Sequence, residues 1–212
     1  MGIHMMNAVN VVAVLGKKHV SVTIEASDSG NLTASSLVYL TAHNAASGGV
    51  NDQDNCTFGQ SYLTGAFGVI RGGLIFDTSA IPASADILEA FVSLQGALDM
   101  SVTDFLMTIV DGSELTDPLV GTNFGDLLDS IVSLGEKDSS TFVIDNWNAI
   151  DLNAAGIAAI VKGGTTKFGV RSSRDISALT PKLDGGDATE YVACYGTYPG
   201  DPKPRLTILY EM

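Results

Sequence analysis

The chain has 212 residues, of which 45% are hydrophobic, so it holds enough apolar surface to fold and a disordered chain is excluded. Its formal net charge is −13, from 24 acidic and 11 basic residues. Binding to a phosphate backbone needs clustered Lys and Arg, so nucleic acid is not expected as a partner.

The start of the chain resembles neither an export signal nor a membrane anchor. The apolar run at residues 9–15 is far too short to cross a bilayer. Lys17 and Lys18 follow this run, whereas a secretory signal places its positive charge before it. We therefore expect neither signal-directed export nor a membrane partner.

The first predicted element is a β-hairpin. Residues 9–15 and 19–25 are rich in β-branched side chains, and Gly16 begins the turn between them. Because this hairpin precedes the most recognisable part of the chain, residues 1–26 are predicted to form an N-terminal arm or pair of strands that serves assembly. Residues 27–212 are then predicted to form one domain.

The rest of the chain predicts short strands separated by polar loops. Strands are predicted at residues 37–41, 68–77, 85–95, 103–110, 168–172, 189–195 and 205–210. Loops are predicted at residues 27–31, 45–60, 179–187 and 196–204. Apolar side chains at three-four spacing predict short helices within residues 121–134 and 153–162. This order favours an all-β fold, an antiparallel β-sandwich or jelly roll with one or two short helices in its connections.

Catalytic patterns are weak, and we predict a protein that is not an enzyme. Nucleophilic catalysis needs a Ser, Cys or Thr beside an oriented base. His43 is the one histidine suited to act as a base, and no nucleophile-elbow sequence accompanies it. The 24 acidic residues define no particular pair of carboxylates, so glycoside hydrolysis is not indicated.

Two cysteines, Cys56 and Cys194, lie far apart in the sequence, in a predicted loop and a predicted strand. Their spacing matches no metal site and demands no disulfide. We interpret them as unpaired small hydrophobic residues, with a single bridge as the alternative.

The metal hypothesis concerns the acidic residues of two polar loops, at residues 52–55 and 184–187. Asp52 and Asp54 offer the hard oxygen ligands that Ca²⁺ takes from loops, although the pattern is not that of an EF-hand. Acidic residues in such loops more often cap turns, which is the first interpretation. A structural Ca²⁺ at this pair is the alternative, and no other cofactor is predicted.

Aromatic residues suggest where a sugar would bind. Trp147, the only tryptophan, follows Asn146, and the late loop carries Tyr195 and Tyr198. Aromatic rings stack on sugar faces while amides bind the hydroxyl groups. Core packing is the first interpretation of an aromatic at a strand end, and glycan binding by these four residues is the alternative.

Three arginines lie in apolar surroundings. Arg71 is within a predicted strand, and Arg171 and Arg174 belong to the segment VRSSRDIS. A buried guanidinium must be paired, and Asp77 and Asp175 are the nearest acidic candidates in the sequence. We predict structural ion pairs among these five residues.

Three segments together carry a family resemblance: RGGLIFDTSAIPASADILEAFVSLQG, TKFGVRSSRDIS and PRLTILYEM. They resemble DNRLRE-type domains, which are β-sandwiches similar to carbohydrate-binding modules. The matching positions of the first motif are Arg71, Phe76, Asp77, Ser79, Ile81 and Pro82. Those of the last strand are Pro204, Leu206, Ile208 and Tyr210.

The resemblance implies a structural role. Stand-alone chains of this kind look like tailed-phage and other viral proteins found on the virion exterior as capsid decoration, turret or fibre components. Expected partners are other virion proteins or copies of the same chain. The alternative that the resemblance implies is an extracellular carbohydrate-binding module that recognises host or other surface glycans.

Overall fold

The computed structural model describes residues 10–14, 16–52, 55–183 and 186–212. Its strands are β1 (Asn10–Val14), β2 (Lys17–Ser36), β3 (Gly49–Asp52), β4 (Asn55–Leu63), β5 (Ala66–Asp77), β6 (Asp86–Ser101), β7 (Leu106–Asp111), β8 (Gly135–Asp138), β9 (Trp147–Asp151), β10 (Thr165–Ser172), β11 (Ala188–Tyr195) and β12 (Arg205–Glu211). Its helices are α1 (Tyr39–His43), α2 (Asn123–Asp126), α3 (Ala154–Ala158) and α4 (Ser173–Ile176), with one 3₁₀ turn at Ser139–Thr141.

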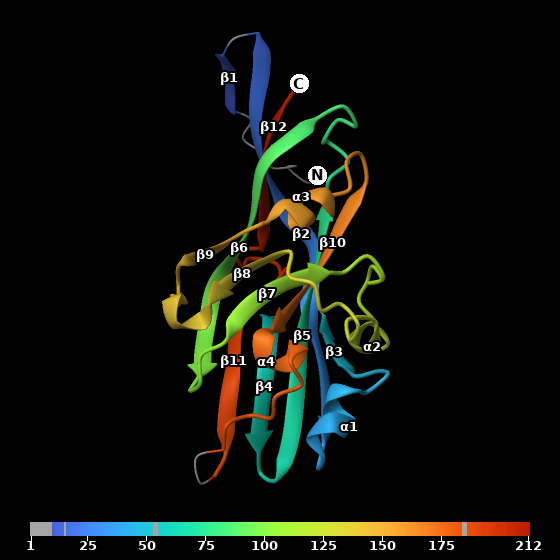
Figure 1. The fold of residues 1–212 in the computed structure, drawn as a ribbon, viewed down its shortest axis with the longest axis vertical. Coiled ribbons are helices and arrows are strands. Elements are labelled where there is room, and N and C mark those ends of the chain that lie inside the picture. Colours follow the sequence, from blue (N-terminus) through green and yellow to red (C-terminus); the bar gives the residue numbers. More distant parts are fainter. Residues whose placement is uncertain (1–9, 15, 53–54, 184–185) are drawn as a thin grey trace.

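The strands pair antiparallel in the order β1-β2-β12-β6-β11-β4-β5-β10-β7-β8, with β3 beside β2 and β9 beside β6 (Figure 1). A further pairing between β2 and β5 closes six of these strands into a ring. The predicted antiparallel all-β fold is therefore confirmed. The finer prediction of a jelly-roll order stays a prediction, and the described residues form four short helices rather than one or two.

Two long strands, β2 and β6, join the two halves of the molecule, one built around β12 and the other around β5 and β11. β2 pairs with β12 through residues 19–25 and with β5 through residues 26–36. β6 pairs with β12 through residues 86–93 and with β11 through residues 96–101. Because each strand serves both halves, the halves share one continuous hydrogen-bonded framework.

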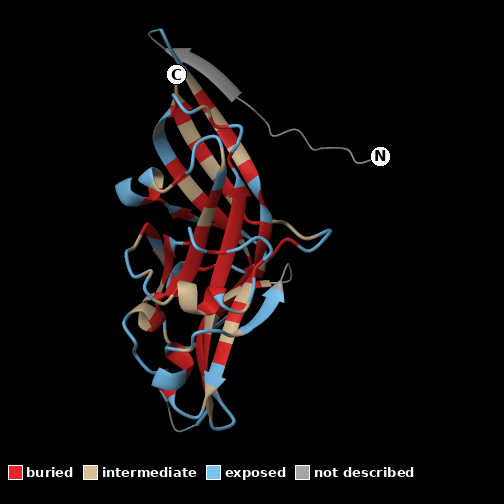
Figure 2. Cartoon of the chain, turned by 90° about the vertical axis from the view of Figure 1, so that its right-hand side faces the viewer, coloured by how far each residue is buried: buried red, intermediate tan, exposed pale blue. Residues whose placement is uncertain are grey.

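The larger core lies between the facing strands. β2 shows how the sequence builds it, because Val20, Val22, Ile24 and Ala26 alternate with more exposed residues and all enter this core. Such alternation places one face of a strand on the core and the other toward solvent. Figure 2 shows the buried residues concentrated along the central strands.

A second, smaller core covers the outer face of β5 and its neighbours. Leu32, Ile75 and Val110 from the strands meet Tyr39 from α1 and Phe124 from α2. With the larger core on one face and this smaller core on the other, β5 and β7 are buried on both faces, which explains why their sequences are nearly continuous apolar runs.

The predicted division at residue 26, between an N-terminal arm or pair of strands and the domain, does not coincide with the end of an element. It falls inside β2, where Val20 to Ala26 contribute to the larger core. Residues 17–26 are thus part of the sandwich because their apolar face needs burial. The predicted hairpin is present, with Gly16 at φ +82 between β1 and β2, and residues 1–9 lie outside the described part of the chain.

Three local predictions also fail. Residues 27–31, predicted as a loop, continue β2 beside β5. Residues 45–60, also predicted as a loop, contain β3 and the start of β4. Residues 37–41, predicted as a strand, lead into α1, where Tyr39 and Ala42 are buried on one side. Pairing with neighbouring strands and packing against the second core override the local residue preferences in each case.

Candidate functional site

The most concentrated set of charges surrounds Asp175 in the second core. Ser172 begins α4 by accepting a hydrogen bond from the Asp175 amide, 3.0 Å away, which holds this aspartate at the helix start. Its carboxylate accepts a hydrogen bond from Nε of Arg71 on β5 at 3.0 Å and another from Nε of Arg171 on β10 at 2.6 Å. All three side chains are fully buried.

The two arginines also bind backbone carbonyls of the segments that cover the sheet. Arg71 donates to the carbonyls of Phe124, at 2.7 Å, and His43, at 2.9 Å. Its guanidinium also lies 4.2 Å from the centre of the Phe124 ring. Arg171 donates through Nη1 to carbonyls of residues 127, 128 and 130. The cluster therefore ties α1 and the segment around α2 to the sheet.

His43, the candidate base, belongs to this cluster. Its Nε2 lies 2.8 Å from the Asp175 carbonyl and its Nδ1 lies 2.6 Å from Oδ1 of Asn44. The ring is buried, with both nitrogens engaged by protein groups. This geometry describes a histidine that positions backbone rather than one that faces a substrate.

A second buried group centres on Glu190 of β11. Its carboxylate accepts hydrogen bonds from Nε of Arg174 at 2.6 Å and from Nε2 of Gln60 at 2.7 Å. Gln60 in turn accepts a hydrogen bond from the Tyr39 hydroxyl at 2.8 Å. Arg174 therefore pairs with Glu190, a residue that was not among the partners predicted for the arginines.

Asp77, predicted as a partner for Arg71, is exposed and accepts a hydrogen bond from the Ser79 amide at 3.0 Å. That prediction is wrong, because the Arg71 guanidinium lies on the side of β5 that faces α4 and reaches Asp175 instead. Asp77 shapes the turn after β5, as aspartates at such positions commonly do.

The electrostatics of the cluster follow from burial and close pairing. Burial by itself would raise the pKa of Asp175, but the hydrogen bonds and positive charges of Arg71 and Arg171 outweigh it and lower that pKa. Burial lowers the pKa of the Arg71 guanidinium, and Asp175 opposes that effect. Such a cluster stabilises the charged forms through mutual pairing, and its chemistry is structural.

The aromatic candidate Trp147 opens β9 on the outer side of the sheet, opposite Gln95 of β6. The ring is partly exposed, and the Arg205 guanidinium lies 4.2 Å from its centre. Arg205 also reaches Glu25 at 3.3 Å. Asn146 is exposed and uses its Oδ1 to accept a hydrogen bond from the Trp147 amide at 2.8 Å.

The two candidate tyrosines lie on the other side of β6. Tyr195 ends β11 and follows Cys194, which is opposite Gly96 of β6. It is partly exposed, whereas Tyr198 in the following turn is 58% exposed. The fold therefore places Trp147 and Tyr195 on strands that flank the same strand, while Tyr198 lies beyond the strand end.

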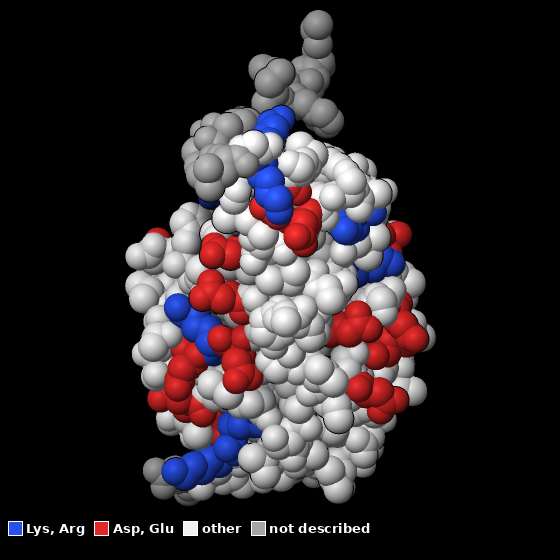
Figure 3. All heavy atoms as spheres, turned by 45° about the horizontal axis from the view of Figure 1, so that its top comes forward, with Lys and Arg blue, Asp and Glu red and all other residues white. Residues whose placement is uncertain are grey.

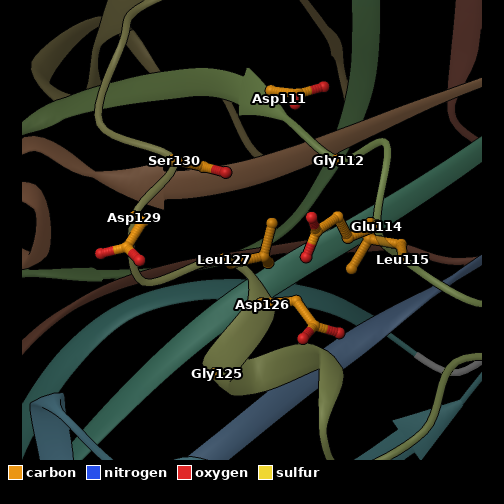
Figure 4. Close-up of a pocket in the computed structure, with 9 residues that line it drawn as sticks. All are labelled: Asp111, Gly112, Glu114, Leu115, Gly125, Asp126, Leu127, Asp129 and Ser130. Carbon is orange, nitrogen blue, oxygen red and sulfur yellow. The ribbon is translucent and has the colours of Figure 1, made fainter.

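A cavity of about 340 Å³ lies beside the second core (Figure 4). Four of its lining residues are acidic: Asp111, Glu114, Asp126 and Asp129. The Asp126 carboxylate accepts a hydrogen bond from Asn123 at 2.8 Å, and Asp111 accepts two from Ser113. Asp and Glu side chains also gather on both flanks of the face in Figure 3, as the net charge leads one to expect.

The calcium hypothesis cannot be placed on this structure, because Asp54 and the side chain of Asp52 lie outside the described residues. Within the described ranges, no three His, Cys, Asp or Glu side chains form a metal-binding group. No helix in the same ranges is long and apolar enough to cross a membrane.

Comparison with known proteins adds no family: no protein-family model matches the chain, and no curated protein matches its sequence. The resemblance to DNRLRE-type domains is therefore carried by the three sequence segments alone.

Proposed function

We propose that this protein is a non-enzymatic structural component of a virus particle, exposed on the particle surface and assembled through its β1–β2 hairpin. The observation that carries the proposal is the position of β1. It ends the strand order and has β2 as its one neighbour among the described strands. Figure 1 shows β1 at one extremity of the molecule, far from α1 and the β4–β5 turn.

An edge strand of this kind supports assembly by strand addition. Its unpaired backbone groups offer hydrogen bonds to a strand from a neighbouring copy. The sandwich behind it is rigidified by the buried Asp175 cluster, whose charges bind each other and the covering segments. A rigid body with a projecting strand suits a repeated structural subunit.

The placement on a virion rests on the sequence resemblance. Capsid and tail genes beside the coding gene would support this placement, whereas genes for polysaccharide-degrading enzymes would support the carbohydrate-binding alternative. The assembly part of the proposal is tested separately, on the purified protein.

The assembly test compares two truncations by light scattering coupled to size-exclusion chromatography. Removing residues 1–15 deletes β1 and leaves β2 paired with β12. Removing residues 1–8 keeps β1 and serves as the matched control. We expect oligomers from the full chain and the control, and folded monomers from the shorter variant. A monomeric full chain, or a shorter variant that still assembles, would overturn the proposal.

A second candidate function is glycan binding around Trp147. It is favoured by the arrangement of Trp147 and Tyr195 on either side of β6, with both rings partly exposed. In this proposal the Arg205 side chain swings off the Trp147 ring to admit a sugar. Glycan-array binding that is lost in Trp147→Ala and kept in Leu37→Ala, an exposed residue near α1, would support it. An array on which the full chain binds nothing would reject it.

A further inference from the structure

We propose that Cys56 and Cys194, the only two cysteines, are joined by a cross-strand disulfide when the chain folds in the presence of a disulfide oxidant such as oxidised glutathione. From the sequence, Cys56 is predicted to lie in a loop, and a bridge to Cys194 is the alternative to two unpaired residues. The structure places Cys56 in β4 and Cys194 in β11, directly opposite each other in the antiparallel register.

The register satisfies the geometry of a disulfide. Directly opposite residues of antiparallel strands have Cα atoms about 4.5 to 5.5 Å apart. Disulfides span Cα separations of about 4.4 to 6.8 Å. Opposite residues also direct their side chains to the same face of the sheet, and both sulfurs enter the larger core. Both cysteines are free thiols in the structure, and their register places the Cα atoms within the separation that a disulfide spans.

The surroundings leave room for the sulfur atoms. Gly72 of β5 lies against Cys56, and a Cβ added at Gly72 would be 2.8 Å from the Cys56 Sγ atom. Val170 of β10 closes the same space from the next strand. The absence of a side chain at Gly72 therefore accommodates a sulfur within the core.

The reaction balances by thiol–disulfide exchange. One protein thiolate attacks oxidised glutathione, forms a mixed disulfide and releases one reduced glutathione. The second protein thiolate then displaces the second glutathione, so one S–S bond forms in the protein and one breaks in the oxidant. Two electrons pass to glutathione, and the protons of the two thiols end on the two reduced glutathione molecules.

The burial of both thiols sets the time at which this bond forms. Both residues are fully buried, and burial raises the pKa of the Cys56 thiol to about 12. The thiolate is the reactive form, so the folded, reduced protein reacts slowly with any oxidant. We therefore expect the disulfide to form during folding, before β4 and β11 close over the sulfurs.

The test is refolding of the full chain from urea, with and without a mixture of reduced and oxidised glutathione. Thiols are then counted by mass spectrometry after maleimide labelling of the unfolded product. We expect no labels after oxidative refolding and two after reduction. A linked peptide pair containing both cysteines should appear in a non-reduced digest. Two labels, glutathione adducts or disulfide-linked dimers after oxidative refolding would overturn the proposal.

A thermal measurement gives a second readout. The oxidised protein should melt roughly 5–15 °C above the reduced protein, because the bond closes a long loop in the unfolded chain. The variants Cys56→Ala and Cys194→Ala should melt at the same temperature under oxidising and reducing conditions. An equal melting temperature for the oxidised and reduced wild-type protein would count against a disulfide.

Discussion

At the scale of single residues, Asp175 links two strands of the sheet to the segments that cover them. It is the shared partner of two buried guanidiniums that bind backbone carbonyls on the covering segments. Such an arrangement is costly to break, since removing one partner leaves uncompensated buried charge. Stability and the position of α1 therefore depend on one carboxylate.

The first prediction is that Asp175→Asn, which keeps the size of the side chain, lowers the free energy of unfolding by about 3–5 kcal/mol. The reason is that Arg71 and Arg171 would lose the charge between them. Urea unfolding followed by circular dichroism measures the change. The control is Asp77→Asn, an exposed turn residue, for which we expect a loss below about 1 kcal/mol. Equal losses in the two variants would contradict this account.

The second prediction concerns acid. The pKa of Asp175 is lowered from its ordinary value of 3.8, chiefly by its two arginine partners acting against burial. A group whose folded pKa is depressed stabilises the protein above its unfolded pKa, and that contribution is lost as the pH falls through the folded value. The gap in unfolding free energy between wild type and Asp175→Asn should thus be constant near neutral pH and narrow below about pH 4.

This pH dependence is measured by urea titrations of both proteins between pH 7 and pH 3. Other carboxylates, such as those of Asp77 and Asp138, are present in both proteins and cancel in the difference. A gap that widens with acid would show that Asp175 has no depressed pKa.

At the scale of elements, the close approach of β4 and β11 depends on one glycine. Gly59 of β4 has φ +134, and a Cβ there would lie 2.2 Å from the Glu190 carbonyl oxygen and 2.5 Å from the Tyr191 Cα atom. The neighbouring residue Gln60 binds the Glu190 carboxylate. The glycine therefore allows the strand contact that places this buried polar group.

The third prediction is that Gly59→Ala costs about 3 kcal/mol or more, because backbone strain is added to a backbone clash. The matched variant is Gly65→Ala in the β4–β5 turn. Gly65 also has a positive φ, of +87, but a Cβ there would meet nothing within 4 Å. We expect it to cost about 1–2 kcal/mol. Thermal unfolding of both variants separates the loss of stability caused by the backbone clash from the loss caused by backbone strain. Equal losses in the two variants would exclude a clash at Gly59.

The elements that were predicted correctly share a local signal. The strand at residues 68–77 is a nearly continuous apolar run, that at residues 85–95 alternates, and a turn marked by Asp77 and Pro82 separates them. Both appear, as β5 and β6. β3 and the start of β4 carry no such signal, since Gly, Asn and Asp are unfavourable in strands. They are strands because β2 and β11 supply hydrogen-bonding partners from distant parts of the chain.

The same reasoning separates the candidate sites. An arginine within an apolar strand predicts a buried ion pair, and Arg71 with Asp175 is such a pair. The sequence could not show that Glu190 would pair with Arg174, because that contact depends on where α4 packs on the sheet. Nor could it show that Cys56 would lie opposite Cys194, because that relation arises from strand register. Register is set by the whole set of pairings and carries no short-range signature.

At the scale of the whole molecule, two cores share one framework of strands. β2 and β6 each run through both halves, and β5 has one face on the larger core and the other on the smaller. An unfolded smaller core would expose the outer face of β5 and leave Arg71 and Arg171 without their partners. We therefore expect one cooperative unfolding transition for both cores.

The fourth prediction tests this coupling with the single tryptophan, which lies on β9. Leu127→Ala removes a buried side chain from the smaller core and should lower the free energy of unfolding by about 2–5 kcal/mol. The urea midpoints measured by tryptophan fluorescence and by circular dichroism should fall to the same lower value. The reason is that loss of the smaller core destabilises the strands whose unfolding Trp147 reports. The control Ile131→Ala, an exposed residue of the same segment, should leave both signals unchanged. If circular dichroism showed an early transition while the fluorescence midpoint stayed in place, the smaller core would unfold independently, and the shared strands would not couple the two halves.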